Sequence, residues 1–296
     1  MTTSPIIDLF EQERSRLFAL AYAVLGSRAE AADTVQDAWL RWDCARRESA
    51  DLREPGAWLT TVITRLALDR LRSARARRES YPGVWLPEPV VDAPSAEEQA
   101  LQRANLTIAF VFLLERLGPE ERAAFVLREV FDESYREIAA ALEKSEAACR
   151  QLVTRARERV REDRVRKPVD RVEFDRVLNR YLAALAAGDA HELVELIAPG
   201  AVLYGDGGGK RLAVVNPLQG PDRIIRFMLG LRRKYPGQFS VVPASVNGFP
   251  GFRIMVGDEM IGIAYYEVAD GRIQNIYNVL NPDKLAREPV IVRSIR

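Results

Sequence analysis

The first eighty residues place apolar side chains at the three- and four-residue spacing of amphipathic helices. This spacing predicts three helices, at residues 8–25, from about residue 29, and at residues 56–78. A charged loop at residues 46–55 joins the last two. We therefore expect an all-helical N-terminal unit whose third helix becomes basic toward its C-terminal end.

The second of these helices has two contrasting faces. Its apolar face, which is expected to point into the core, is formed by Val35, Ala38, Trp39 and Trp42. Its opposite face carries an acidic and amide patch formed by Asp33, Gln36 and Asp37. Taken alone, this patch is most simply a solvated helix surface.

Residues 81–94, YPGVWLPEPVVDAP, interrupt the helical pattern with four prolines. Proline fixes its own φ and pushes the preceding residue toward extended conformations, so the segment cannot be a helix. A flexible tether would be rich in glycine and serine and would not expose large apolar side chains. Val84, Trp85 and Leu86 are therefore expected to dock on an apolar surface. A stiff proline spacer with incidental aromatic residues is the alternative.

The sharpest local signal follows two further helices, expected at residues 96–117 and 119–131. Ser134 and Glu137 form a capping box that opens a short helix at residues 135–142. After a tight turn, Ser145 caps a second helix. This arrangement predicts a helix-turn-helix, whose second helix enters the major groove of duplex DNA. An ordinary helical hairpin is the alternative.

The outer face of that second helix carries side chains suited to DNA. Those that can contact base edges are Arg150, Gln151 and Thr154. Arginine pairs with guanine and glutamine with adenine. Those that can hold phosphates are Arg155, Arg157, Arg159 and Arg161.

The composition of the chain changes after Pro168. Three helices are expected in this part, at residues 172–187, 190–197 and 222–234. Extended runs are expected at residues 201–204, 239–246, 252–256, 260–268 and 272–280. Helices followed by antiparallel strands predict an α+β domain in which a curved sheet wraps around helices.

Length and composition agree with two or three soluble globular domains, because 296 residues exceed one small core and the chain is 48% hydrophobic and 29% charged. The net charge of +1 does not indicate nucleic acid, but the distribution of charge does. Residues 65–78 hold six arginines against one acid, and residues 144–167 hold nine basic residues against four acids. For either cluster alone, a solvated arginine-rich face is the alternative.

Two cysteines far apart, Cys44 and Cys149, and a single histidine, His191, argue against a disulfide framework and a zinc site. No cofactor is expected. No apolar stretch is long enough to span a bilayer, and the polar, acidic start shows no signal peptide. A cytoplasmic protein without membrane contact is expected.

Three stretches carry a family resemblance: VQDAWLRW at residues 35–42, GAWLTTVITRLALDRLR at residues 56–72, and residues 117–160, LGPEERAAFVLREVFDESYREIAAALEKSEAACRQLVTRARERV. They resemble regions 2 and 4 of extracytoplasmic-function (ECF) sigma factors, in the right order over about the first 165 residues. The resemblance implies a factor that directs promoter-specific transcription initiation. Its implied partners are promoter DNA and the RNA polymerase core, through the β′ clamp helices and the β flap.

The resemblance also implies a domain order and residue roles. Region 2 would span residues 1–80, a proline-rich linker residues 81–95, and region 4 residues 96–167. Core-polymerase contacts would come from Asp33, Gln36, Asp37 and Arg41. The melted minus-ten element would be read and held by the loop at residues 46–55 with Arg65, Asp69, Arg72 and Arg75. The minus-thirty-five element would be read and held by Arg150, Gln151, Thr154, Arg155 and Arg157. A basic groove suits single-strand capture, and a major-groove helix suits duplex reading.

The C-terminal half resembles the SnoaL-like branch of the nuclear transport factor 2-like fold, a cone that often encloses a small pocket. The matching segments are WLPEP (Trp85, Leu86, Pro87, Glu88, Pro89), DGGGK (Asp206, Gly207, Gly208, Gly209, Lys210) and NPDKL (Asn281, Pro282, Asp283, Lys284, Leu285). Together they resemble the ECF sigma factors that carry a fused SnoaL-like extension. In that group the extension replaces a separate anti-sigma factor and modulates activity from within the chain.

The implied architecture is multidomain: two all-α domains, then a SnoaL-like α+β domain at residues 168–285 and a tail at residues 286–296. We expect NPDKL to pack against the WLPEP linker and to fix the spacing of the two DNA-binding domains. Pro282 would shape the turn, and Asp283 and Lys284 would pair with linker or sigma-domain charges.

Asp206 is the one candidate general base in this half, because it ends a strand where the cone would open and related folds include isomerases. No second acid is placed to tune it, and the glycine run lacks the spacing of a phosphate-binding loop, so catalysis is not expected. Two other functions stay open, a ligand-responsive repressor and an isomerase with a DNA-binding appendage. A repressor has no use for the first eighty residues. Within the cone, a ligand-sensing pocket also stays open.

Overall fold

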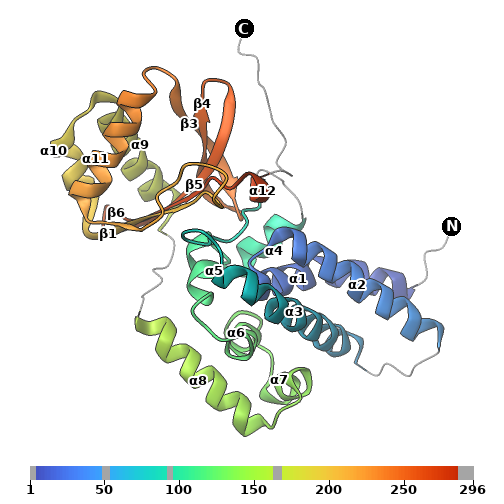
Figure 1. Cartoon of the computed structure of the whole chain (residues 1–296). Coiled ribbons are helices and arrows are strands. Elements are labelled where there is room, and N and C mark those ends of the chain that lie inside the picture. Colours follow the sequence, from blue (N-terminus) through green and yellow to red (C-terminus); the bar gives the residue numbers. More distant parts are fainter. Residues whose placement is uncertain (1–4, 49–53, 92–95, 163–168, 286–296) are drawn as a thin grey trace. The chain divides into compact units, whose positions relative to one another are not determined.

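The computed structural model describes residues 5–48, 54–91, 96–162 and 169–285 (Figure 1). The chain forms two compact units. Of the described residues, the first comprises 5–48, 54–80 and 96–162, and the second comprises 81–91 and 169–285. The segment 81–91 therefore belongs to the C-terminal unit, although it lies in the sequence between two parts of the helical unit.

The helical unit contains the elements α1 (Pro5–Leu25), α2 (Arg28–Arg47), α3 (Pro55–Glu79), α4 (Ala96–Arg103), α5 (Ile108–Leu114), α6 (Pro119–Phe125), the π-helical turn η1 (Val126–Val130), α7 (Tyr135–Leu142) and α8 (Glu146–Glu162). The three N-terminal helices confirm the prediction, and α1 packs against α2 and α3. Trp42 is fully buried, and its ring lies 5.8 Å from that of Trp58 on α3.

Two predicted helices are corrected. The stretch 96–117 is broken after Arg103, because Asn105 adopts a left-handed conformation with φ of 52°. Thr107 then caps a new helix by accepting a hydrogen bond from the Phe110 amide at 3.1 Å. The stretch 119–131 is regular only to Phe125 and continues as a π-helical turn.

The helix-turn-helix is formed as its sequence predicts. The Glu137 amide donates to Ser134 Oγ at 3.3 Å, and the Ser134 amide donates to Glu137 Oε2 at 2.8 Å, which completes the capping box. Glu143, in the left-handed region with φ of 54°, ends α7. The Ala148 amide donates to Ser145 Oγ at 3.2 Å and so caps α8.

The C-terminal unit contains a six-stranded sheet in the order β2-β1-β6-β5-β4-β3. Its strands are β1 (Ile197–Asp206), β2 (Leu218–Gln219), β3 (Phe239–Val246), β4 (Phe249–Val256), β5 (Glu259–Ala269) and β6 (Arg272–Val279). The expectation of an antiparallel sheet needs correction, because β1 and β6 run parallel. The chain leaves β1, passes through α11 and the β3–β6 meander, and returns beside β1 in the same direction.

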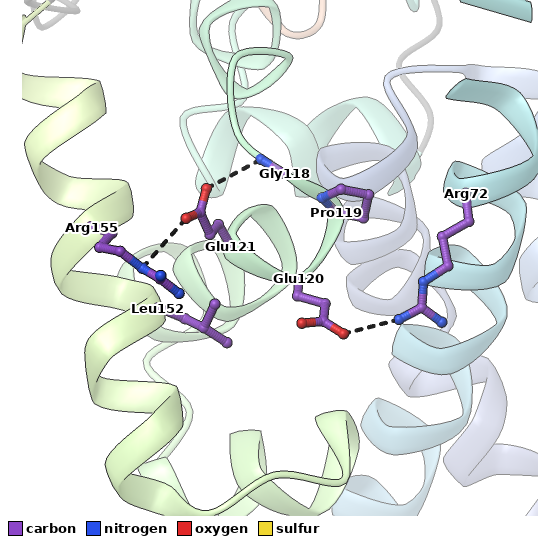
Figure 2. Close-up of a pocket in the computed structure, with 7 residues that line it drawn as sticks. All are labelled: Arg72, Gly118, Pro119, Glu120, Glu121, Leu152 and Arg155. Atoms are coloured by element: carbon purple, nitrogen blue, oxygen red, sulfur yellow. Dashed lines mark hydrogen bonds and ion pairs between the residues drawn. The ribbon is translucent and has the colours of Figure 1, made fainter. Parts of the chain in front are cut away.

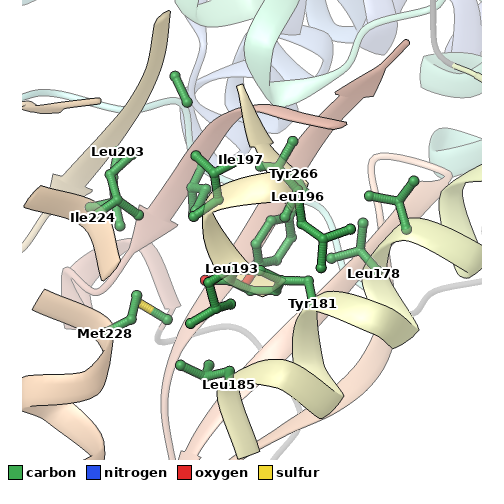
Figure 3. Close-up of a cluster of buried hydrophobic side chains, with 14 of the residues drawn as sticks. Leu178, Tyr181, Leu185, Leu193, Leu196, Ile197, Leu203, Ile224, Met228 and Tyr266 are labelled. Atoms are coloured by element: carbon green, nitrogen blue, oxygen red, sulfur yellow. The ribbon is translucent and has the colours of Figure 1, made fainter. Parts of the chain in front are cut away.

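The helices of this unit are α9 (Arg171–Ala187), α10 (Ala190–Leu196), α11 (Pro221–Lys234) and the short α12 (Pro282–Leu285). The first three cover one face of the sheet (Figure 1). Side chains fill the space between them (Figure 3), and the rings of Tyr181 and Tyr266 meet there at 5.9 Å. Burial raises the pKa of both phenols. None of the helices in the described parts of the chain combines the length and apolar composition that a membrane span requires.

Candidate functional site

The clearest polar site of the C-terminal unit lies at the end of β1, where Asp206 is fully buried. Its carboxylate accepts three hydrogen bonds, from the Tyr81 hydroxyl at 2.5 Å, from the Leu86 amide at 2.9 Å and from Lys284 Nζ at 2.7 Å. Two of these donors belong to the segment 81–91 and the third to α12. One carboxylate therefore joins the segment to the sheet and to NPDKL.

Lys284 makes the second set of contacts with the segment. Its ammonium also donates to the Leu86 carbonyl, and it lies 3.8 Å from the centre of the Trp85 ring. Cation–π contacts act within about 6 Å, so the charge is held by a carboxylate, a carbonyl and a ring together. Only 10% of this side chain is exposed.

Asn281 and Tyr81 complete this cluster. Asn281 Nδ2 donates to the Tyr81 hydroxyl at 2.7 Å, and that hydroxyl in turn donates to Asp206. Burial, followed by the hydrogen bond to Asp206, raises the pKa of Tyr81, so the phenol stays protonated and remains a donor.

A second anchor holds the other end of the segment. The Val90 amide donates to Asn247 Oδ1 at 2.9 Å, the Asn247 amide donates to the Val90 carbonyl at 2.7 Å, and Val91 bridges to Val246. Sequence reasoning missed Asn247. The available signal was the Asn-Gly pair between β3 and β4, which is typical of a tight hairpin turn.

The segment between these anchors is docked, as its apolar side chains predict. Leu86 is fully buried, and Val84 and Trp85 are partly buried. The following three residues of the motif, Pro87, Glu88 and Pro89, are also buried.

The glycine run fits closely against this cluster. A Cβ at Gly208, whose φ is +60°, would lie 2.4 Å from Asn281 Nδ2. A Cβ at Gly209 would lie 2.9 Å from Pro82 Cγ. Lys210 Nζ pairs with Asp283 at 2.6 Å. The structure thus brings DGGGK, NPDKL and WLPEP together, although they lie far apart in the sequence.

In the helical unit, two arginines of α3 contact elements of the helix-turn-helix region. Arg65 donates to the carbonyls of Ala140 and Ala141 at 2.7 and 3.2 Å and pairs with Glu143 at 3.0 Å. Arg72 pairs with Glu120 on α6 at 3.1 Å. Asp69 lies 3.6 Å from Arg72 on the same helix. The side chain of Arg75 and residues 49–53 of the loop lie outside the described residues.

The patch on α2 is partly tied to α3. Arg70 pairs with Asp37 at 2.6 Å and lies 3.9 Å from Asp33. Gln36 and Arg41 are exposed. The patch therefore remains open to solvent, with its charge partly balanced from α3.

The predicted DNA-contacting residues of α8 are exposed: Arg150, Gln151, Thr154, Arg155 and Arg157. Acids hold several of them, since Arg150 pairs with Glu146 and Arg157 with Glu129, each at 2.7 Å. A cavity of about 360 Å³ lies beside α8 (Figure 2), lined by Arg72, Gly118, Pro119, Glu120, Glu121, Leu152 and Arg155.

Glu121 on α6 was not singled out by sequence reasoning. It is buried, accepts from the Gly118 amide at 3.3 Å, and pairs with Arg155 at 3.5 Å and with Arg159 (Figure 2 shows the first two partners). It thereby connects the start of α6 to the outer face of α8.

Neither unit shows a metal centre in its described residues, where no cluster of His, Cys, Asp and Glu is arranged to hold an ion. Asp206, the candidate base, has its oxygens bound by Tyr81, Leu86 and Lys284. Its environment is therefore that of a structural anchor.

Comparison with known proteins places both helical regions. The family model for sigma-70 region 2 matches residues 9–77, and the model for sigma-70 region 4 matches residues 108–160. The chain is 39% identical to the ECF RNA polymerase sigma factor SigJ of Mycobacterium tuberculosis, covering 96% of this chain and 94% of the relative. It is 29% identical to the probable ECF RNA polymerase sigma factor SigI of the same species, covering 95% of each.

A solved structure covers the whole architecture. The crystal structure of Mycobacterium tuberculosis SigJ superposes with a TM-score of 0.79 at 36% identity, covering 96% of this chain and 99% of that chain. The similarity therefore includes the C-terminal unit as well as both helical regions.

Proposed function

This chain belongs to the ECF RNA polymerase sigma factors, and from that premise we propose that its SnoaL-like C-terminal domain regulates promoter recognition in cis by holding the segment 81–91. ECF sigma factors bind RNA polymerase core and promoter DNA, and here regions 2 and 4 are both present. The segment 81–91 connects them in the sequence. A contact that holds this segment therefore also restricts the distance between regions 2 and 4 when they bind promoter DNA.

The observation that carries the proposal is the convergence on Asp206. A buried carboxylate with three hydrogen bonds, two of them from the segment, is a specific attachment. In the second anchor Asn247 binds Val90, which lies only four residues along the segment from Leu86. The segment is thus fixed at two points, and release at either would free more of the connection between the two regions.

We propose that core polymerase is contacted by the α2 patch at the β′ clamp helices and by region 4 at the β flap. The patch that supports this role is Asp33, Gln36, Asp37 and Arg41. The minus-ten element would be held by the loop at residues 46–55 with Arg65, Asp69, Arg72 and Arg75. The minus-thirty-five element would be read and held by the exposed residues of α8. The contacts of Arg65 and Arg72 with α6 and α7 would have to be exchanged for contacts with DNA.

Because the regulatory domain lies within the chain, we propose that no separate anti-sigma factor is needed. We also propose that the protein acts in the cytoplasm, together with the polymerase. We do not propose catalysis, because Asp206 is enclosed by its three partners and a base must reach its substrate. The same enclosure argues against an isomerase with a DNA-binding appendage.

Run-off transcription with purified polymerase core tests the proposal. The full chain would be compared with a chain ending at Leu280 and with Lys284→Met, on a promoter selected with the full chain. The matched control is Lys234→Met, which removes an exposed lysine at the end of α11 that faces the Tyr235 ring. Both altered chains should change promoter output, whereas the control should not. Equal output from all four would refute regulation in cis. Duplex binding by the full chain alone, with no transcription from any promoter, would favour a repressor.

A further inference from the structure

We propose that Tyr135, the first residue of α7, is a positioning residue that aligns the Arg150 guanidinium for base reading at the minus-thirty-five element. The inference rests on the proposed role of Arg150 in that element. It adds a residue outside the recognition helix to the determinants of promoter sequence preference.

The Tyr135 ring is contacted by two guanidinium groups. The Cζ atom of Arg150, on α8, lies 4.8 Å from the ring centre, and that of Arg128, on η1, lies 5.3 Å from it. Both distances are within the cation–π range. The ring therefore joins the elements that precede and follow α7.

Tyr135 is itself held in place. It directly follows the cap residue Ser134, whose capping box with Glu137 fixes the first turn of α7. Arg128 is fixed on its own side, because it donates to the Glu133 carbonyl at 2.9 Å. The ring thus presents a defined surface to Arg150.

Arg150 needs such a surface. Its side chain is 55% exposed, and its other contact is an ion pair with Glu146 one helical turn earlier, at 2.7 Å. An exposed ion pair restricts a long side chain only weakly. Bidentate reading of a guanine edge, in contrast, requires the planar guanidinium in one orientation. The ring supplies that restriction without neutralising the charge.

The proposal predicts different effects of replacing Tyr135 on base preference and on overall affinity for DNA. Replacing Tyr135 by a residue without a ring leaves the positive charge of Arg150 in place, so attraction to phosphates is retained. Its base contact loses alignment, so preference falls at the base pair that Arg150 reads. A purely structural role for Tyr135 would instead weaken binding at all positions alike.

The test uses full-length chain assembled with polymerase core and a duplex library randomised across the minus-thirty-five element. Arg150→Ala first identifies the base pair whose preference depends on Arg150. Tyr135→Leu and Tyr135→Met are expected to lower the preference at that same base pair by about 2- to 5-fold, the factor that an exposed cation–π contact provides. Tyr135→Phe keeps the ring and should keep the preference.

The matched control is Tyr235→Leu, which removes a ring 5.5 Å from Lys234 in the C-terminal unit and should change nothing at the promoter. Two results would overturn the inference: unchanged preference in both ring-less variants, or an equal loss in Tyr135→Phe. A uniform loss at every position would assign Tyr135 a structural role instead. If Arg150→Ala itself alters no position, base reading by Arg150 fails and the inference fails with it.

Discussion

Asp206→Asn is the most direct perturbation of the attachment between the segment 81–91 and the C-terminal domain. Asparagine has nearly the same shape, so packing at the end of β1 is kept. The change removes the negative charge opposite Lys284. It also leaves one side-chain oxygen as an acceptor, whereas the two carboxylate oxygens of Asp206 accept three hydrogen bonds. It therefore tests the chemistry of the anchor and not its volume.

The burial of the Asp206–Lys284 ion pair determines the expected free-energy cost of Asp206→Asn. Asp206 is 0% exposed and the side chain of Lys284 is 10% exposed, so the ion pair is a buried one. Removing one partner of a buried pair costs about 3–5 kcal/mol. Lys284 retains the Leu86 carbonyl and the Trp85 ring, which offset part of this cost. The lower value, about 3 kcal/mol, is therefore expected for opening of the segment.

Amide hydrogen exchange of the full chain measures this opening directly. At about 1.4 kcal/mol for each factor of ten, the Leu86 amide should exchange about a hundredfold faster in Asp206→Asn than in the unaltered chain. The control is Asp175→Asn, the same change at an acid whose partner is Arg171 on α9. Unchanged exchange at Leu86 in Asp206→Asn, or equal acceleration in the control, would refute the anchoring argument.

Two further changes test neighbouring features. Gly208→Ala should lower the melting temperature of the chain, because the added Cβ would overlap Asn281 Nδ2 and the backbone there has a φ of +60°. Gly200→Ala should leave the melting temperature unchanged, because nothing lies within 4 Å of its added Cβ. Thermal unfolding of the two variants tests this prediction. Hydrogen bonds from Ser134 hold the pKa of Glu137 below its ordinary value of 4.5, so the unfolded chain binds this proton more tightly and the stabilisation is lost as the pH falls below that value. Glu137→Gln should therefore flatten the acid side of a stability–pH curve from urea unfolding, and an unchanged slope would contradict this account.

Local signals in the sequence predicted the parts of the fold that depend on local chemistry. The capping box at Ser134 and Glu137 gave the start of α7, because a cap satisfies backbone donors within one turn. The break at Asn105 was not predicted, since a continuous apolar run follows it and hides the change of direction. The positive φ of Asn105 alone ends the first helix at this point.

Non-local pairing accounts for what was missed in the C-terminal unit. The parallel pairing of β1 with β6 is set by the return of the chain over about seventy residues, which strand periodicity alone does not encode. The two-residue strand β2 is too short to leave a periodic signal. Asn247 was missed for the same reason, because its partner Val90 is distant in the sequence.

Asp206 illustrates why function had to be argued from contacts. At the end of a strand in a fold that includes isomerases, a lone acid is a reasonable candidate base. The same acid accepts a phenol, an amide and an ammonium group, and these leave it no free oxygen to abstract a proton from a substrate. Tyr81 and Leu86 lie in the segment and Lys284 lies in NPDKL, so this acid holds the segment that connects the two helical regions in the sequence.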